Sequence, residues 1–496
     1  MDMTNLIDLS IDQITIALSK GEFTSRELTS AYLDQIRSFE SNLNAFITVT
    51  TEIALKQADE ADRVLLRKRK QGELINSPYL GVPIAIKDIL VTEGIPTTAG
   101  SRILASFIPP YNATCVKRLL DSGMVIVGKT NMDEFAMGSS TENSAYKPSR
   151  NPWNINRVPG GSSGGSAVAV AARMTPLAIG TDTGGSVRQP ASFCGLTGLK
   201  PTYGRVSRYG LIAFGSSLDC VGILARSARD IAGIYQLIAG HDPRDATSSD
   251  YPVTKVELDR YNHFDTLRIG IPKEYFSDGI QTEIKEAIDQ TIEQFVDLGA
   301  EVIEISLPHT SYAIPAYYLI APAEASTNLA RFDGVRYGPR EKSDDIWEMF
   351  LKTRGALFGQ EVKRRIMLGT YALSAGYIDA YYGKAQKVRH LINQDFEDAF
   401  NQVDIIAAPV NPTTAFEIGA HHEDPLSMYL EDIFTTPVNL AGVPGLAFPI
   451  GFDDENLPIG MQIIAPHFQE DLLLKIVNMY QQITNWHLQK PTLISE

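Results

Sequence analysis

The sequence of 496 residues has few of the features that mark secreted, membrane or metal-binding proteins. Its three cysteines, Cys115, Cys194 and Cys220, are too widely spaced for a zinc site or a disulfide framework, so we expect no metal and a reducing, cytoplasmic location. No segment approaches the roughly 18 apolar residues of a membrane-spanning helix. The first ten residues hold two acids and no basic residue, which is untypical of a secretory signal peptide. We therefore expect no association with a membrane.

Basic residues are also in short supply. The chain has 44 Lys and Arg against 59 Asp and Glu, which leaves a net charge of −15 at pH 7. This excess of acidic residues argues against nucleic-acid binding by this chain alone. The one basic run, at 67–70, ends a predicted helix, where cations interact favourably with the helix dipole. We interpret that run as a solvated helix end.

Histidine, the usual base for a serine nucleophile, does not occur before His241. A later histidine could fold back, so a Ser–His pair stays open, but another base has to be considered. Lys87 lies in the apolar segment GVPIAIKDIL, which predicts a buried strand. Burial would lower the pKa of this lysine until the neutral amine could accept a proton. The alternative is an ion pair with Asp88, although neighbours on a strand point to opposite faces.

Glycine and serine are concentrated in one region, 160–188. One cluster, GGSSGGS, covers 160–166, and a second, TGGS, covers 183–186. Glycine lets backbone N–H groups approach a ligand, and successive N–H groups can form a concavity for negative charge. A serine in such a turn is a candidate nucleophile beside an oxyanion hole. The alternative is a pair of flexible loops, which a predicted buried helix at 167–172 and a strand at 176–180 argue against.

These segments carry a resemblance to a known family. Lys87-Asp88, GGSSGGS and TDTGGSVR, with Ser162 75 positions after Lys87 and Ser186 24 positions after Ser162, resemble the amidase signature family. The resemblance implies a Ser–Ser–Lys triad in which Ser186 is the nucleophile, Ser162 the bridging serine and Lys87 the base. It also implies a cis peptide bond before Ser162. It places the oxyanion hole at the N–H groups of Thr183, Gly184, Gly185 and Ser186.

The order of predicted elements indicates an α/β protein. Thr24 and Glu27 have capping-box spacing at the start of a helix, and the strand, helix and strand over 267–305 are typical of a sheet with parallel strands. No linker, repeat or low-complexity segment divides the chain. The resemblance covers nearly the whole length. It implies a single large domain, 1–496, with a central mixed, mostly parallel twisted sheet covered by helices on both faces.

Three sections of this domain differ in composition. We expect N-terminal helices over 1–75, a Gly-Ser catalytic core over about 80–225 and a substrate-pocket section over about 226–496. Within them, we predict helices throughout 8–70, a short helix at 131–137 and loops over 195–222. Further predicted strands cover 82–89, 124–127, 403–408 and 457–466.

Two motifs match other enzyme classes. Residues 123–130, GMVIVGKT, fit the phosphate-loop pattern, but a helix precedes them and the spacer MVIV predicts a strand. Nucleotide binding there is a minor alternative. Residues 160–164 fit the G-x-S-x-G elbow of α/β-hydrolases, but no convincing strand leads into it.

The C-terminal half contains the pattern of a substrate pocket. Phe358, Val362, Arg365 and Gly369 fall on one helical face, so Arg365 is predicted to face the apolar side. A guanidinium fork suits a carboxylate, because it donates two parallel hydrogen bonds. A structural ion pair is the alternative interpretation of Arg365.

Two segments, EASTNLARFDGVRYG and TTPVNLAGVPG, resemble the branch of the family that serves tRNA-dependent amidotransferases. The resemblance maps Arg365 to the glutamine-binding arginine, Asp432 to the carboxylate that meets the α-ammonium and Tyr317 to a pocket tyrosine, with Tyr318 one residue away. It implies a glutaminase that passes ammonia to a tRNA-binding B subunit, which uses ATP and Mg²⁺, while a small C subunit joins the two. On that basis this chain itself binds no cofactor.

Other functions remain open at this stage. The alternative within the family is a stand-alone amidase for another small amide. A catalytically inactive scaffold is a further alternative, which the intact Lys87, Ser162 and Ser186 argue against. The sequence leaves open whether the product is Gln-tRNA, Asn-tRNA or both.

Overall fold

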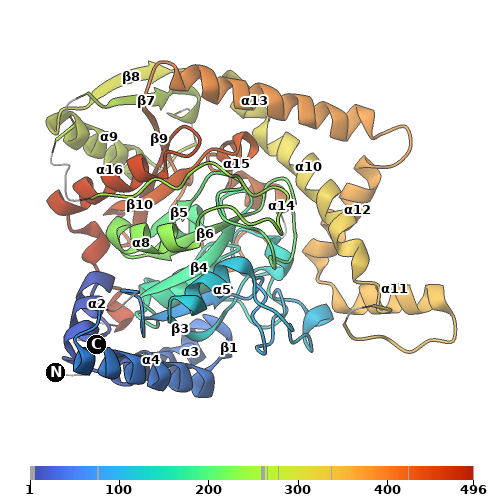
Figure 1. The fold of residues 1–496 in the computed structure, drawn as a ribbon. Helices are drawn as coiled ribbons and strands as arrows, with labels where there is room; N and C mark the ends of the chain where they lie inside the picture. The colour runs from blue at the N-terminus through green and yellow to red at the C-terminus, as the bar shows by residue number, and fades with distance from the viewer. Residues whose placement is uncertain are drawn as a thin grey trace.

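An eleven-stranded mixed sheet runs through the molecule in the order β1-β3-β2-β4-β6-β5-β10-β11-β9-β7-β8 (Figure 1). The computed structural model describes residues 6–74, 77–258, 263–264, 266–276, 279–336, 338–422 and 424–494. The strands are β1 Phe46–Val49, β2 Pro83–Lys87, β3 Val125–Thr130, β4 Leu177–Asp182, β5 Thr197–Lys200, β6 Cys220–Ala225, β7 Arg268–Pro272, β8 Glu301–Ile305, β9 Ile405–Pro409, β10 Gly445–Phe452 and β11 Pro458–Ile464. One continuous sheet confirms the predicted single-domain α/β fold.

The sheet is mixed, as predicted, but parallel pairs are the minority. Among the ten strand pairings of the described residues, four are parallel and six are antiparallel. The parallel pairs lie in two groups, β3-β2-β4 and β9-β7-β8, and the strands between those groups run antiparallel. The mostly parallel sheet was implied by the family resemblance, and the observed pairings correct it. Antiparallel strands in the centre of the sheet can be joined without a crossover helix. Strands β10 and β11, for example, are joined by the short turn between Phe452 and Pro458.

Helices surround this sheet. Their bounds are α2 Ile11–Lys20, α3 Ser25–Leu43, α4 Thr51–Gln71, α5 Thr114–Asp121, α6 Gly164–Ala171, α7 Arg188–Phe193, α8 Ala228–Ile238, α9 Thr282–Asp297, α10 Ala313–Asn328, α11 Ile346–Leu357, α12 Gln360–Ala372, α13 Lys384–Phe400, α14 Pro425–Leu430, α15 Thr436–Ala441 and α16 Glu470–Ile483. Helices α2 to α4 lie at one end of the sheet and α9, α13 and α16 at the other, while α10, α11 and α12 extend to one side (Figure 1). Among the described residues, none of the helices combines the length and apolar character needed to cross a membrane.

Several local predictions are confirmed. Thr24 caps α3, accepts a hydrogen bond from the Glu27 amide at 3.1 Å and has its own amide bound by the Glu27 carboxylate at 2.7 Å, which completes the capping box. All residues of α6 are buried, as expected for the helix between the two Gly-Ser clusters. The three cysteines are buried free thiols.

Other local predictions are wrong, and two of them fall where strand pairing overrides a weak local pattern. The predicted helices over 8–70 are interrupted by β1, a four-residue strand that pairs with β3. The predicted loops over 195–222 contain β5 and the start of β6, which pair with each other. The predicted helix at 131–137 is a single 3₁₀ turn, Glu134–Ala136, in which Phe135 and Ala136 have positive φ. Strand β10 is a central strand that no sequence pattern predicted.

The fold brings the two sequence motifs to one edge. Strands β2 and β4 are parallel neighbours, with Ala85 opposite Ala178 and Ile86 opposite Ile179. Their carboxyl ends therefore meet at the same edge of the sheet, where α/β proteins place their ligands. Lys87 ends β2, and the second Gly-Ser cluster follows the end of β4.

Candidate active site

Lys87 is the buried centre of this edge. Its Nζ donates hydrogen bonds to three hydroxyls, those of Ser162 at 2.8 Å, Ser163 at 2.9 Å and Thr181 at 2.8 Å. The neighbouring Asp88 lies on the opposite face and forms an ion pair with Lys129 at 3.2 Å. The structure therefore rejects the alternative of a Lys87–Asp88 ion pair.

The environment of Lys87 favours a neutral amine. Burial lowers the pKa of Lys87 to about 7, although three carboxylates, those of Asp133, Asp182 and Asp219, act in the opposite direction. A neutral amine has two N–H bonds and one lone pair for its three partners. Because Ser163 Oγ donates its own proton to the Thr181 carbonyl at 3.1 Å, Ser163 can only accept from Lys87. The lone pair is then left to Ser162 or Thr181.

The first Gly-Ser cluster is shaped around Ser162. The peptide bond between Gly161 and Ser162 is cis, as the family resemblance implies. A Cβ on Gly161 would lie 2.1 Å from Asp133 Oδ2, so only glycine fits beside that buried carboxylate. Ser162 is fully buried, whereas Ser186 keeps 7% of its surface exposed. Of these two serines, Ser186 is the one that a substrate can reach.

The second cluster forms a tight turn next to Ser186. The amides of Gly184, Gly185 and Ser186 have no hydrogen-bond acceptor within the described part of the chain. The Gly184 carbonyl, in contrast, accepts hydrogen bonds from Thr435 Oγ1 at 2.7 Å and Thr436 Oγ1 at 3.2 Å. Holding the carbonyl from one side leaves the amides free to meet a negative oxygen on the other.

Neighbouring side chains leave no room in this turn for larger residues. A Cβ on Gly184 would lie 2.9 Å from the Tyr317 ring, and one on Gly185 would lie 2.2 Å from Thr435 Oγ1. Thr183 is anchored by its hydroxyl, which donates to Asp219 Oδ1 at 2.8 Å. The predicted oxyanion-hole residues thus form one constrained turn, and their catalytic role stays a prediction.

A buried ion pair between Asp182 and Arg188 flanks the turn at 183–186. Asp182 ends β4, and its Oδ1 lies 3.1 Å from Arg188 Nη2. Asn439 joins both partners: its amide donates to Asp182 Oδ1 at 2.8 Å, and its Oδ1 accepts from Arg188 at 2.6 Å. Burial alone would raise the pKa of Asp182, but Arg188 holds that pKa at about 2. Sequence reasoning did not assign this role, although both charged residues stand in the TDTGGSVR motif.

Arg365 faces the interior, as the helical pattern of 358–369 predicts. Phe358, Val362, Arg365 and Gly369 are all buried, whereas the Arg364 side chain is partly exposed. Arg365 Nε donates to Glu361 Oε1 at 2.7 Å, which is the structural ion pair raised above as an alternative. That pair uses only Nε, and no described residue accepts from the two terminal NH₂ groups. The fork itself is therefore available to a ligand carboxylate.

Aromatic rings enclose the same guanidinium. Its Cζ lies 5.1 Å from the centre of the Tyr318 ring, 5.5 Å from that of Tyr429 and 5.6 Å from that of Phe214. Tyr318 stacks on Tyr429 with 3.8 Å between ring centres. Tyr317, by contrast, contacts Gly184. The two adjacent tyrosines therefore have separate places, Tyr317 at the turn of residues 183–186 and Tyr318 over the arginine.

Asp432 is a buried carboxyl group of the same region. It accepts a hydrogen bond from Ser139 Oγ at 2.5 Å. Burial raises the pKa of Asp432 to about 8, with a further contribution from Glu431, while Arg365 acts to lower it. A cationic ligand group beside Asp432 would favour the ionised carboxylate.

A cavity of about 310 Å³ opens beside Arg365. Its walls include Ser140, Glu361, Arg365, His421 and Tyr429. Its volume suits a small molecule such as an amino acid.

The residues that match the phosphate-loop motif, 123–130, do not form a phosphate-binding loop. Gly128, Lys129 and Thr130 belong to β3, and the Lys129 side chain is fully buried. Lys129 Nζ donates to the Leu90 carbonyl at 3.0 Å and to Thr97 Oγ1 at 2.8 Å. A phosphate loop needs a flexible backbone and a lysine that is free to reach the phosphates. Here the backbone is a strand and Lys129 is bonded within the protein, so the structure removes the nucleotide-binding alternative at this motif.

The fold and the Lys87 cluster are those of an amidase. Residues 27–474 match the protein family described as Amidase, and the chain belongs to this family. Among curated proteins, it is 57% identical over 491 residues to the A subunit of Glutamyl-tRNA(Gln) amidotransferase from Roseiflexus sp. (strain RS-1), covering 99% of each chain. It is 53% identical over 494 residues to the protein of the same name from Chromohalobacter salexigens, again covering 99% of each.

Solved structures agree with this family. The crystal structure of the Glutamyl-tRNA(Gln) amidotransferase A subunit from Thermotoga maritima superposes with a TM-score of 0.81 at 39% identity, covering 98% of each chain. A 6-aminohexanoate cyclic dimer hydrolase has a TM-score of 0.83 at 25% identity, covering 98% of this chain and 99% of that one. The fold is therefore shared by amidases with different substrates.

Proposed function

We propose that this chain is the glutaminase component of a tRNA-dependent amidotransferase. The observation that carries this proposal is the near full-length similarity, at 53–57% identity, to proteins named as the A subunit of Glutamyl-tRNA(Gln) amidotransferase. The Lys87 cluster and the arginine-lined cavity support it independently of any name. Together they provide a candidate base, an accessible serine and a pocket for an amino acid.

The proposed chemistry gives each of these hydroxyls and amides a role. Ser186 Oγ attacks the side-chain carbonyl of glutamine, and its proton moves through Ser162 to the neutral Lys87. The developing oxyanion is bound by the amides of the turn at 183–186. The protons return to the leaving group, so ammonia departs and a glutamyl ester remains on Ser186. Water then hydrolyses that ester to glutamate by the same route in reverse.

The pocket residues orient the amino acid. The free fork of Arg365 binds the α-carboxylate, and Asp432 binds the α-ammonium. Tyr317 packs against Gly184 and limits the space between the substrate and the turn. This arrangement would direct the side-chain amide of glutamine towards Ser186.

Ammonia leaves this chain for a partner. In the proposed complex, the B subunit binds tRNA and activates the glutamyl group of Glu-tRNA(Gln), or the aspartyl group of Asp-tRNA(Asn), with ATP and Mg²⁺, while the small C subunit joins the two larger ones. This chain then needs no cofactor of its own. The three free thiols suit the reducing cytoplasm, where we place this reaction.

The test compares two ammonia sources in the complex of this chain with its co-expressed partners. Ser186→Ala is expected to abolish amidation from glutamine and to leave amidation from added ammonium chloride unchanged. Equal loss of both activities would contradict the proposal. If the purified chain instead hydrolyses varied small amides at high rate without partners, the alternative of a stand-alone amidase is correct.

A further inference from the structure

A network of buried hydrogen bonds surrounds Thr141, which lies in a loop at 138–143 beside the first Gly-Ser cluster. The Thr141 hydroxyl donates to the Gly160 carbonyl at 2.7 Å and accepts from the Gly164 amide at 3.1 Å. These backbone groups belong to the residues two positions before and two positions after Ser162. One side chain from another segment therefore joins both sides of the turn that carries Ser162. The mechanism proposed above gives this side chain no role.

The backbone of Thr141 has an unfavourable conformation. Its φ is +64°, in the left-handed region that β-branched residues rarely adopt. The Thr141 amide donates to Asp133 Oδ2 at 2.9 Å, and Asp133 Oδ1 accepts from the Asn143 amide at 3.0 Å, so one buried carboxylate holds this conformation. Strained backbone that is held by its surroundings is concentrated at functional sites. The strain at Thr141 therefore suggests a role beyond packing.

The loop and the cluster are in close contact. A Cβ on Gly164 would lie 2.1 Å from Thr141 Oγ1, and one on Gly161 would lie 2.8 Å from the Thr141 amide nitrogen. Only glycine permits this approach of the two backbones. Thr141 is fully buried, so solvent does not compete for its hydrogen bonds.

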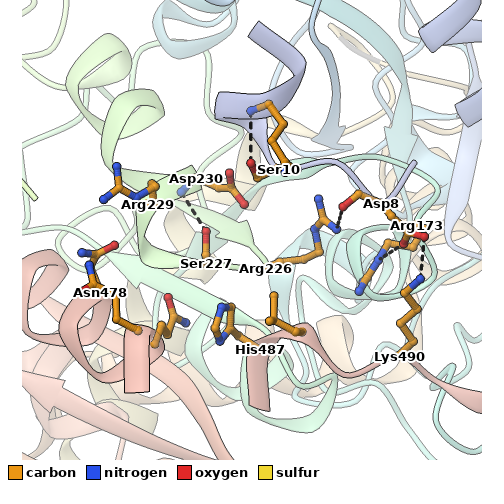
Figure 2. Close-up of a pocket in the computed structure, with 14 residues that line it drawn as sticks. Asp8, Ser10, Arg173, Arg226, Ser227, Arg229, Asp230, Asn478, His487 and Lys490 are labelled. Atoms are coloured by element: carbon orange, nitrogen blue, oxygen red, sulfur yellow. Dashed lines mark hydrogen bonds and ion pairs between the residues drawn. The ribbon is translucent and has the colours of Figure 1, made fainter. Parts of the chain in front are cut away.

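Helix α6, which begins at Gly164, is anchored separately at its far end. Arg173 follows this helix, donates to the Ala171 carbonyl at 3.2 Å and lies 3.5 Å from Asp8 in an ion pair. Arg173 and Asp8 both line a second cavity, of about 540 Å³, between the N-terminal and C-terminal segments (Figure 2). Thr141 provides the corresponding anchor at the end of α6 that is next to Ser162.

We propose that Thr141 is a positioning residue, which holds Ser162 within reach of Lys87 by fixing both sides of its turn. This inference rests on the proposed function, in which Ser162 passes a proton from Ser186 to Lys87. Ser162 Oγ lies 2.8 Å from Lys87 Nζ, and movement of either side of the turn would change that distance. Proton transfer depends steeply on such distances. The Thr141 hydroxyl bonds only to backbone groups, so it acts through the turn and not on the substrate.

The test measures alkylation of the nucleophile in the complex of this chain with its co-expressed partners. The probe is a chloromethyl ketone derived from glutamine, which forms a bond to the serine oxygen and releases chloride, while the serine proton passes to the base. The rate of labelling reports how well the serine is activated. The final labelled fraction reports how many chains are folded, so a merely structural role would change the fraction and not the rate.

Two substitutions at position 141 isolate the hydroxyl. Thr141→Val keeps the shape of the side chain but can neither donate nor accept, and it should slow both labelling and kcat by about 10- to 100-fold. The labelled fraction and KM should stay within about twofold of the wild type, because no hydrogen bond joins Thr141 to Arg365 or Asp432 in the described part of the chain. Thr141→Ser keeps the hydroxyl and should label within about threefold of the wild-type rate.

A third substitution reaches the same contact from the opposite side. Gly164→Ala adds a Cβ that would meet Thr141 Oγ1, so it should separate the hydroxyl from the turn and slow labelling as Thr141→Val does. This variant decides the question if Thr141→Val does not fold.

Thr50→Val is the matched control. Thr50 is also buried and donates its hydroxyl to a backbone carbonyl, that of Ile126, at 2.7 Å. This variant should label at the wild-type rate, since its hydroxyl has no contact with the Gly-Ser cluster. Slow labelling of Thr50→Val, or of Thr141→Ser to the same extent as Thr141→Val, would overturn the inference, because the hydroxyl of Thr141 would not be the cause.

Ser162→Ala separates this inference from the proposed function. If Ser162→Ala labels slowly while Thr141→Val and Gly164→Ala label at the wild-type rate, only the role of Thr141 is wrong. If Ser162→Ala labels at the wild-type rate, the proposed proton relay is wrong and the role of Thr141 is lost with it.

Discussion

At the scale of single residues, Lys87 shows how the partners of a buried amine determine what it can do. Three hydroxyls surround it and no carboxylate forms a direct ion pair with it among the described residues, so burial outweighs the more distant acids and lowers its pKa to about 7. A carboxylate in direct contact would have kept the amine charged. The hydroxyl environment is therefore what makes a neutral lysine base accessible near neutral pH.

This pKa predicts a pH profile. Only the neutral amine accepts a proton, so kcat/KM for glutamine should rise with pH through about 7 and level off above it. Lys87→Ala should lose activity, and Lys87→Arg should not restore it, because guanidinium stays protonated. Glutamine hydrolysis measured from pH 5.5 to 9 tests both points. Substantial activity in Lys87→Arg would show that only the positive charge matters.

Ser163 provides a second prediction at this scale. It accepts a hydrogen bond from Lys87 but has its own proton committed to the Thr181 carbonyl, so it positions the amine without relaying protons. Ser163→Ala should lower kcat about tenfold, in line with one lost hydrogen bond of roughly 1.4 kcal/mol. It should also move the acid limb of the pH profile to lower pH, because an acceptor of the charged amine is gone. Ser162→Ala, the comparison variant, should abolish turnover; equal effects of the two variants would contradict this division of roles.

At the scale of elements, α12 carries two adjacent arginines in different environments. Both side chains border the cavity and form ion pairs with Glu361, but Arg365 is buried whereas the Arg364 side chain is partly exposed. Because the two side chains share one partner and one helix, they form a matched pair for mutagenesis. The helical periodicity explains why only Arg365 is buried on the apolar face of the helix.

Arg365→Ala should weaken glutamine-dependent amidation by roughly 100-fold, since two charge-assisted hydrogen bonds to the α-carboxylate are worth about 3 kcal/mol. Amidation from ammonium chloride should persist, because ammonia does not use this pocket. Arg364→Ala should leave both activities within about twofold of the wild type, as is usual for partly exposed ion pairs. Steady-state rates of the assembled complex with each nitrogen source test this. A parallel loss of both activities in Arg365→Ala would instead make Arg365 a structural residue.

At the scale of the whole molecule, the turn at 183–186 is held by the distant C-terminal half. Thr435 and Thr436 hold the Gly184 carbonyl, and Asn439 bridges Asp182 and Arg188. These contacts join residues separated by about 250 positions in the chain. The geometry of the turn is therefore coupled to the stability of the complete sheet.

Removing the charge of Asp182 tests that coupling. Asp182→Asn leaves Arg188 buried without its carboxylate and should lower the free energy of unfolding by about 3–5 kcal/mol. The pKa of Asp182 is lowered to about 2 in the folded state, so its contribution is complete above the unfolded value near 3.9 and is lost as the pH falls towards 2. Urea unfolding at pH 7 and at pH 3 measures both effects. Asp34→Asn, which breaks an exposed ion pair with Arg37, should cost less than about 1 kcal/mol, and a similar cost for the two variants would refute the prediction.

Local patterns in the sequence were enough to single out several candidate site residues, whose catalytic roles stay predictions. Lys87 was identifiable because a lysine in an apolar strand is unusual, and the two Gly-Ser clusters because such turns place amides next to a serine. The face of Arg365 followed from helical periodicity. Each of these signals depends on neighbours within a few positions, which is the range over which backbone geometry is determined by sequence.

The tertiary structure alone decided which distant groups these residues meet. Thr181 and Ser163 as partners of Lys87, Thr435 at the catalytic turn, and the meeting of both chain ends around Arg226 depend on packing between segments far apart in the chain. The antiparallel centre of the sheet has the same origin, since β10 takes its place through pairing with β5 and β11. Strand pairing and side-chain burial are set by the complete set of packed elements, so a pattern within one element cannot specify them.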